Sequence, residues 1–170
     1  MARSGSPRWA ESPERAALLA LYAEVDALVE GWTCACSTPR EDPPSARCCH
    51  FAVTGREPYP TAVELEEVRH GVRTAGIAPR NPGRLPVIHE PALGACPLLS
   101  AGQRCRIYAS RPFGCRTFFC DGAEAPFGGR GKLPREAIQA LGRRVADLSA
   151  RFAPRDPGPR PLVRALLTGR

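Results

Sequence analysis

The sequence predicts a small α+β or irregular domain stabilised by metal. About three helices are expected to pack around a cysteine-lined site, with short strands or a hairpin. The prediction rests on eight cysteines, on three stretches with helical spacing, and on few aromatics (6%) beside 19 prolines and 16 glycines. A chain of 170 residues fits one domain. Because large core side chains are scarce, metal cross-links would help to hold such a fold.

The first helix is expected to begin after Ser12, a capping residue followed by Pro13 at the first helical position, and to stop near Gly31. Its apolar residues recur at helical spacing, as expected for a helix that packs on a core. They are Leu18, Leu21, Tyr22, Val25, Leu28 and Val29.

Two further helices are predicted downstream. Thr61 and Glu64 have the spacing of a capping box, so a helix should run from about residue 62 to 74, on the surface with one face inward. The third should run from about Pro134 to Phe152 and pack on the cysteines. Its apolar positions are Ile138, Leu141, Val145 and Leu148.

Short strands are predicted around the cysteines. Residues 50–53 have the composition of a strand, and residues 96–99 and 104–108 flank a turn, as in a hairpin. Such a hairpin would place Cys96 and Cys105 near its ends. The domain organisation expected is a disordered N-terminus (1–11), a single cysteine-cluster metal-binding domain (12–152) and a Pro/Arg-rich C-terminal tail (153–170) with apolar residues for a short final turn.

Charge and hydropathy limit the partners. The net charge is +7 and every basic residue except Lys132 is arginine, but the arginines are scattered, so no specific nucleic acid is expected. The early apolar run, residues 16–23, is too short to span a membrane, and no membrane contact is expected. We therefore expect a cytoplasmic protein, in which thiols stay reduced and dense cysteine favours metal binding or redox chemistry over disulfides.

The cysteines form two groups of four, which suit metal or iron–sulfur ligation. All eight are candidate metal ligands: Cys34, Cys36, Cys48 and Cys49, then Cys96, Cys105, Cys115 and Cys120. No pair is separated by two residues, the spacing usual for zinc knuckles. The irregular spacing favours an iron–sulfur cluster, with zinc as the alternative. The adjacent Cys48 and Cys49 are not expected to point at the same corner of a cluster.

Arginines accompany the second group of cysteines. Arg111 and Arg116 flank Cys115 and are candidate cofactor-binding residues, because guanidinium groups stabilise the excess negative charge of thiolate sites. Ordinary solvated arginines are the alternative interpretation. His50 follows Cys49 directly and is a further candidate ligand. No catalytic motif independent of the cysteines is visible, so catalytic residues stay unassigned.

A resemblance follows from the second group. Residues 96–99 (Cys-Pro-Leu-Leu), 104–108 (Arg-Cys-Arg-Ile-Tyr), Arg111-Pro112 and 115–118 (Cys-Arg-Thr-Phe) resemble the YkgJ-type cysteine-cluster family, which has a zinc- or iron-chelating domain. The likeness extends over about residues 32–120. The first group departs from the family pattern, since Cys34 and Cys36 are closer together than expected. The resemblance implies metal chelation in small proteins whose reaction is mostly undefined.

The function expected is therefore that of a metal-binding cysteine-cluster protein with redox or sensing activity. Cys48, Cys49, Cys96, Cys105, Cys115 and Cys120 are the favoured ligands. One alternative is a structural zinc module that binds a protein partner. The other is a small metal-dependent oxidoreductase or protein-modification factor with an open coordination position near Arg111 or Arg116.

Overall fold

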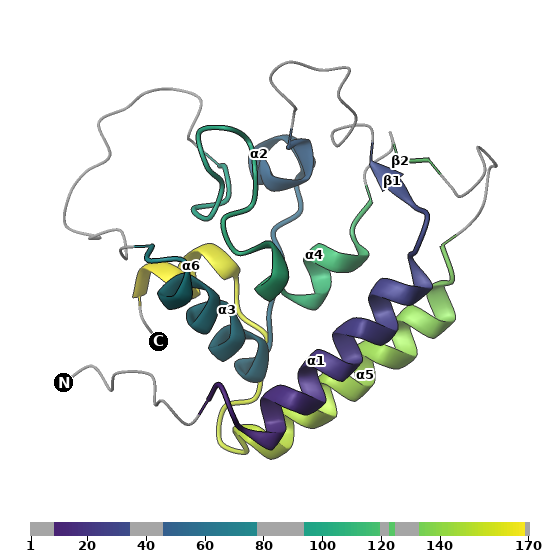
Figure 1. The fold of residues 1–170 in the computed structure, drawn as a ribbon, viewed down its shortest axis with the longest axis vertical. Helices are drawn as coiled ribbons and strands as arrows, with labels where there is room; N and C mark the ends of the chain where they lie inside the picture. Colours follow the sequence, from purple (N-terminus) through teal and green to yellow (C-terminus); the bar gives the residue numbers. More distant parts are fainter. Residues whose placement is uncertain (1–8, 35–45, 78–93, 120–122, 125–132, 169–170) are drawn as a thin grey trace.

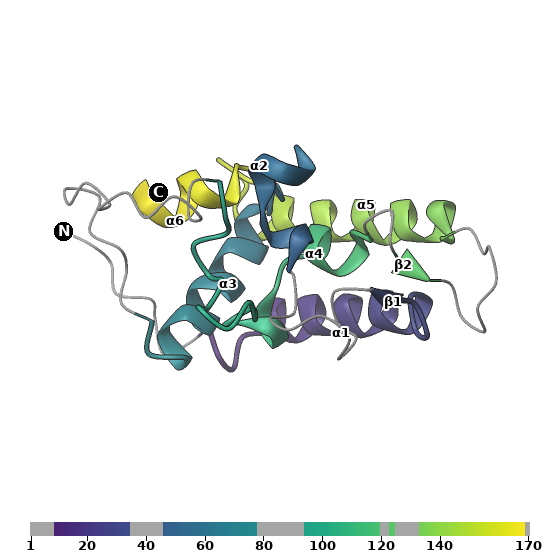
Figure 2. The ribbon, with the colours of Figure 1, turned by 90° about the horizontal axis from the view of Figure 1, so that it is seen from above.

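The computed structural model describes residues 9–34, 46–77, 94–119, 123–124 and 133–168. Helices hold 57% of these residues. The elements in chain order are α1 (Pro13–Leu28), β1 (Thr33–Cys34), η2 (Arg47–Cys49), α2 (Phe51–Thr54), α3 (Ala62–Thr74), η4 (Tyr108–Ser110), α4 (Phe113–Thr117), β2 (Ala123–Glu124), α5 (Arg135–Phe152) and α6 (Leu162–Thr168). Figures 1 and 2 show the long helices α1 and α5 side by side. In Figure 1, α4 lies above this pair and α2 lies above α4.

The longest helices form the main core. The Ser12 side chain accepts a hydrogen bond from the Arg15 amide, and Pro13 occupies the first turn, as the sequence predicts. The apolar faces of α1 and α5 pack on each other and on α3. The buried members of this core are Trp9, Leu18, Leu21, Tyr22, Val25, Val63, Leu141, Val145 and Leu148. Burial on this scale is the main source of stability in a small domain.

The α3 helix joins the main core to a second one. Its capping box is present, with Glu64 Oε2 accepting from both the amide and the hydroxyl of Thr61 at 2.8 Å. The second core contains Leu65, Val68, Leu98, Ile107, Leu162 and Ala165. Glu67 is only 1% exposed, so α3 is more deeply buried than the surface helix predicted from sequence.

The predicted α+β, metal-stabilised fold is wrong. Residues 50–53, predicted as strand, form no strand: helix α2 begins at Phe51, because the chain closes a helical turn there that ends at the left-handed Gly55. Residues 96–99 and 104–108 form no strands and share only an isolated bridge between Leu99 and Cys105. The sheet of the described residues is the two-residue antiparallel pair β1–β2, in which Cys34 faces Ala123.

The predicted arrangement of helices around a cysteine-lined site is also wrong. The apolar stripe of α5 packs on α1, not on the cysteines. In the described part of the chain, no three His, Cys, Asp or Glu side chains lie close enough together to hold a metal ion. The helices therefore stabilise the fold by burying one another's apolar faces.

The packed body extends beyond residues 12–152. Trp9 is 5% exposed, and its Nε1 donates to Glu67 Oε2 at 3.0 Å. At the other end, Leu162 of α6 is 1% exposed in the second core, and its amide donates to the Pro58 carbonyl at 3.1 Å. Both ends of the described chain are thus anchored by burial and hydrogen bonds. None of the described helices combines the length and apolar character needed to cross a membrane.

Candidate metal centre

The adjacent cysteines Cys48 and Cys49 lie on η2, and backbone hydrogen bonds tie this turn to the segment that carries Cys96. The Cys96 amide donates to the Cys49 carbonyl at 2.7 Å, and the Ala52 amide donates to the Gly94 carbonyl at 3.2 Å. Gly94 has φ +85°, and a Cβ there would lie 2.3 Å from the Cβ of Ala52. Glycine is therefore required for the approach of the two segments.

Cys105 is held opposite Leu99 by a closed turn. The Ser100 amide donates to the Arg104 carbonyl, and the Arg106 amide to the Leu98 carbonyl, both at 2.9 Å. Gln103 adopts φ +55°, an unusual value for a residue with a side chain. Its Oε1 lies 2.9 Å from His50 Nε2, so His50 links the turn to η2. In this structure His50 serves to position the cysteine-bearing segments.

Cys115 comes from α4, which is fixed to α3. The Phe113 amide donates to Glu64 Oε1 at 2.7 Å, and the Cys115 amide donates to the Pro112 carbonyl at 2.9 Å. The Tyr22 hydroxyl of α1 donates to the same Glu64 oxygen at 3.3 Å. One buried carboxylate thus connects the main core to the helix that presents Cys115.

The thiols of Cys48 and Cys49 share a contact. Their Sγ atoms lie 3.9 Å apart, and both side chains are half-buried. The hydrogen bond with the Cys49 thiol lowers the pKa of Cys48 to about 6, whereas the same contact and burial raise the pKa of Cys49. The contact therefore favours the thiolate form of Cys48 and the thiol form of Cys49. The two side chains thus lie close together, and whether they face one corner of a cluster stays a prediction.

The other three described thiols interact electrostatically with this pair. Burial, with a smaller contribution from the neighbouring cysteines, raises the pKa of Cys96 to about 11 and that of Cys115 to about 12. Burial is also the largest influence on Cys105, and raises its pKa. All five described cysteines are free thiols. Four separate chain segments thus bring thiols within Coulombic range of one another.

Arg111 is the cation of this site. Its guanidinium adds to the lowering of the pKa of Cys48 and partly offsets the rise that burial causes in the pKa of Cys105 and Cys115. It also stacks over the exposed ring of Tyr108 with Cζ 4.0 Å from the centroid. Its Nε is buried and has no hydrogen-bond partner among the described residues. A guanidinium with a spare donor beside several cysteines suits a site that concentrates negative charge when those cysteines ionise.

Arg116, the other predicted cofactor-binding residue, has structural partners. Its guanidinium donates to the carbonyls of Ala109 and Arg111 and to the carboxylate of Asp26. It is 6% exposed and stacks on the Tyr22 ring with Cζ 4.1 Å from the centroid. Arg116 thus connects the loop before α4 to α1.

Three predicted ligands are not placed at the site by the described residues. Cys34 belongs to β1, of which only the backbone is described. Cys36 and Cys120 lie outside the described residues.

Sequence reasoning missed the buried Glu67. This carboxylate accepts hydrogen bonds from Arg15 Nε at 2.7 Å, Ser110 Oγ at 2.8 Å and Trp9 Nε1. Burial raises its pKa, but these hydrogen bonds lower it more, so the net shift is downward. The available signal was the position of Glu64 and Glu67 among the apolar residues of α3, where an acidic side chain requires a partner.

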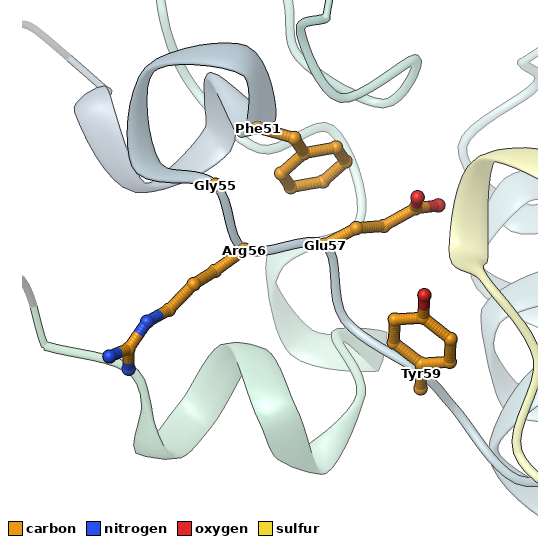
Figure 3. A pocket seen from close by; sticks show the side chains of 5 residues that line it. All are labelled: Phe51, Gly55, Arg56, Glu57 and Tyr59. Atoms are coloured by element: carbon orange, nitrogen blue, oxygen red, sulfur yellow. The ribbon is translucent and has the colours of Figure 1, made fainter.

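An open cavity of about 570 Å³ lies beside α2 and is lined by Phe51, Gly55, Arg56, Glu57 and Tyr59. Figure 3 shows Phe51, Glu57 and Tyr59 on one side of the chain, with Arg56 pointing away toward α4. The carboxylate of Glu57 already accepts from the Val163 amide at 2.6 Å. The Arg56 guanidinium lies over the Phe118 ring, 5.5 Å from its centroid. These contacts fix α6 and α4 and form no nucleophile–base pair.

Comparison with known proteins adds no relative: no protein-family model matches the chain, and neither a curated protein nor a solved structure does.

Proposed function

We propose that this chain binds a metal ion or an iron–sulfur cluster through cysteine thiolates. The observation that carries the proposal is that five free thiols from four chain segments lie within electrostatic range of one another and of one arginine. Thiolates are soft ligands that select zinc and iron–sulfur clusters over hard cations such as Mg²⁺. The likeness of residues 96–118 to the YkgJ-type family supports the same activity, and we propose kinship with that family on this basis.

The cysteine ligands suit a metal ion or an iron–sulfur cluster in their charge as well as in their donor atom. Several thiolates around one centre carry excess negative charge, which the Arg111 guanidinium and its unpaired Nε would offset. The metal or cluster would supply cross-linking, and in the case of iron also electron transfer. Among the described residues, no three thiols lie close enough together to bind one metal ion. The proposal therefore requires Cys96, Cys105 or Cys115 to move inward on binding.

A cytoplasmic location, redox or sensing activity and a protein partner belong to the same proposal. A reducing compartment would keep the thiols free for metal. The alternative of an enzyme that uses Arg116 is not favoured, because the guanidinium of Arg116 is occupied by Asp26 and two carbonyls.

The test is metal analysis with an absorption spectrum on protein purified without oxygen and without added metal. Iron with labile sulfide and a band near ~400 nm would support a cluster. Colourless protein with stoichiometric zinc would support the structural zinc module. A Cys96→Ser/Cys105→Ser variant should lose the metal, whereas Ser100→Ala on the same turn should retain it. Wild-type protein that stays metal-free and takes up neither iron nor zinc would refute the proposal.

A further inference from the structure

The distance between the two adjacent thiols determines what kind of centre they can serve. Two sulfurs that are each about 2.3 Å from one tetrahedral zinc ion lie roughly 3.8 Å apart. The Sγ atoms of Cys48 and Cys49 are 3.9 Å apart. The pair therefore already has the spacing of two ligands on a single metal atom.

The number of cysteines that bind each iron atom differs between types of iron–sulfur cluster. A [4Fe–4S] cluster bound by four cysteines takes one cysteine at each iron, whereas a [2Fe–2S] cluster takes two at each iron. A mononuclear thiolate centre also places two or more sulfurs on one atom. Two sulfurs at 3.9 Å thus suit a mononuclear ion or one iron of a [2Fe–2S] cluster, and do not suit two corners of a cubane.

The surrounding contacts hold the pair in place. The Cys49 carbonyl accepts from the Cys96 amide, and the next residue, His50, contacts Gln103. Cys96 and Cys105 pack on the second core, interact electrostatically with Cys49, and are candidates among the described residues for a third and fourth sulfur. The turn that carries the pair is therefore fixed to the segments that would complete the coordination.

We propose that Cys48 and Cys49 together chelate one metal atom, so that the centre has two adjacent thiolates on the same atom and is not a [4Fe–4S] cluster. This inference rests on the proposed metal-binding function and specifies its coordination. It also identifies zinc, or iron in a mononuclear or [2Fe–2S] centre, as the metal that the pair accepts.

The experiment uses the full chain loaded with ¹¹³Cd²⁺ as a probe for the thiolate site. In a ¹H–¹¹³Cd correlation spectrum, the β-protons of Cys48 and Cys49 should both couple to one ¹¹³Cd resonance. Coupling of the two residues to different resonances, or of only one of them, would overturn the inference and leave metal binding intact. Absence of any cysteine-bound cadmium would overturn the proposed function as well.

Two single variants provide an independent readout. Cys48→Ser and Cys49→Ser should each weaken Cd²⁺ binding by roughly 100-fold or more, since each removes a ligand, and ligands matter more than their neighbours do. An unaffected affinity in either variant would contradict chelation by the pair. Unfolding curves of the metal-free variants show whether a loss of binding reflects loss of structure. A cubane spectrum in protein purified without oxygen would also contradict the inference.

Discussion

The helical body and the cysteine side of this molecule are held together in different ways. The helices α1, α3 and α5 bury a continuous set of apolar side chains. The cysteine side consists of η2, residues 94–106 and α4, joined by backbone hydrogen bonds, isolated bridges and the contact between His50 and Gln103. The main apolar core and the thiols thus lie in different regions, which meet at the second core, where Leu98 packs with residues of α3. We therefore expect the helical body to form without metal.

The largest effect should follow from a cavity in the helical body. Leu18 is fully buried, so Leu18→Ala should lower the free energy of unfolding by about 3 kcal/mol in urea denaturation of the metal-free protein. The control Leu19→Ala removes a side chain that is only partly buried on the same helix, and should cost less. A cost for Leu18→Ala no larger than the control's would show that the helical core is not the main source of stability.

A substitution at Gly94 should damage the cysteine side selectively. Gly94→Ala combines a left-handed φ with a clash against Ala52, and should cost about 2 kcal/mol locally. Gly76→Ala is the matched control, because Gly76 has φ +61° with nothing within 4 Å of the added Cβ, and should cost about 1 kcal/mol. Hydrogen exchange should show faster opening at Ala52 and Cys96, with α1 and α5 still protected. Equal exchange in both variants would argue against a separate cysteine side.

A third prediction concerns Glu67, whose buried carboxylate joins Arg15 of α1 to Ser110 of η4. Its pKa is lowered from 4.5 on folding, so its stabilising effect is present above that pH and is lost as the pH falls through the lower folded value. Glu67→Gln should lower the free energy of unfolding by about 2 kcal/mol at pH 7, because Arg15 loses its buried partner. The difference in free energy of unfolding between the wild type and Glu67→Gln should become smaller in acid.

Glu66→Gln serves as the control for that comparison. Glu66 is more exposed and pairs with Arg69 and Arg73 at the surface, so its loss should change stability by less than about 0.5 kcal/mol. If the difference in free energy of unfolding between the wild type and Glu67→Gln stays constant from pH 7 into acid, the assigned role of the Glu67 carboxylate is contradicted.

Apart from the controls, the smallest effect on stability should come from Cys49→Ala, which changes the ionisation of the thiol pair without removing a side chain of the main core. Cys49 is half-buried at the edge of the fold, so the metal-free protein should lose less than about 1 kcal/mol. The hydrogen bond that lowers the pKa of Cys48 to about 6 disappears, and the midpoint should rise toward 9.0. Alkylation of Cys48, followed by peptide mass spectrometry across pH, measures this shift. Cys105→Ala, which removes no hydrogen bond to Cys48, should leave the midpoint near its original value.

Local signals in the sequence predict the helices well. Ser12 with Pro13, and Thr61 with Glu64, determine where α1 and α3 begin, because capping depends on neighbouring residues only. The apolar spacing of α5 was also predicted, but its partner was not. Which face of the molecule a helix packs on depends on the whole chain, and α5 packs on α1 and not on the cysteines.

The candidate site could be predicted only in part. The cysteines and Arg111 are recognisable by residue type, and five of the thiols do come into proximity. The separate roles of Arg111 and Arg116 were not predictable, because Asp26, the ionic partner of Arg116, is 90 residues away in the chain. Residues 50–53 were misassigned because a short apolar run fits a strand and a helical turn equally well.

The docking of α6 has a consequence for the order of events during synthesis. Residues 157–163 form hydrogen bonds with residues 57–62, and Leu162 and Ala165 complete the apolar cluster on which Cys96 and Cys105 pack. Every described cysteine therefore leaves the ribosome before the segment that seals this cluster. Until α6 is made, the apolar cluster beside Cys96 and Cys105 lacks Leu162 and Ala165.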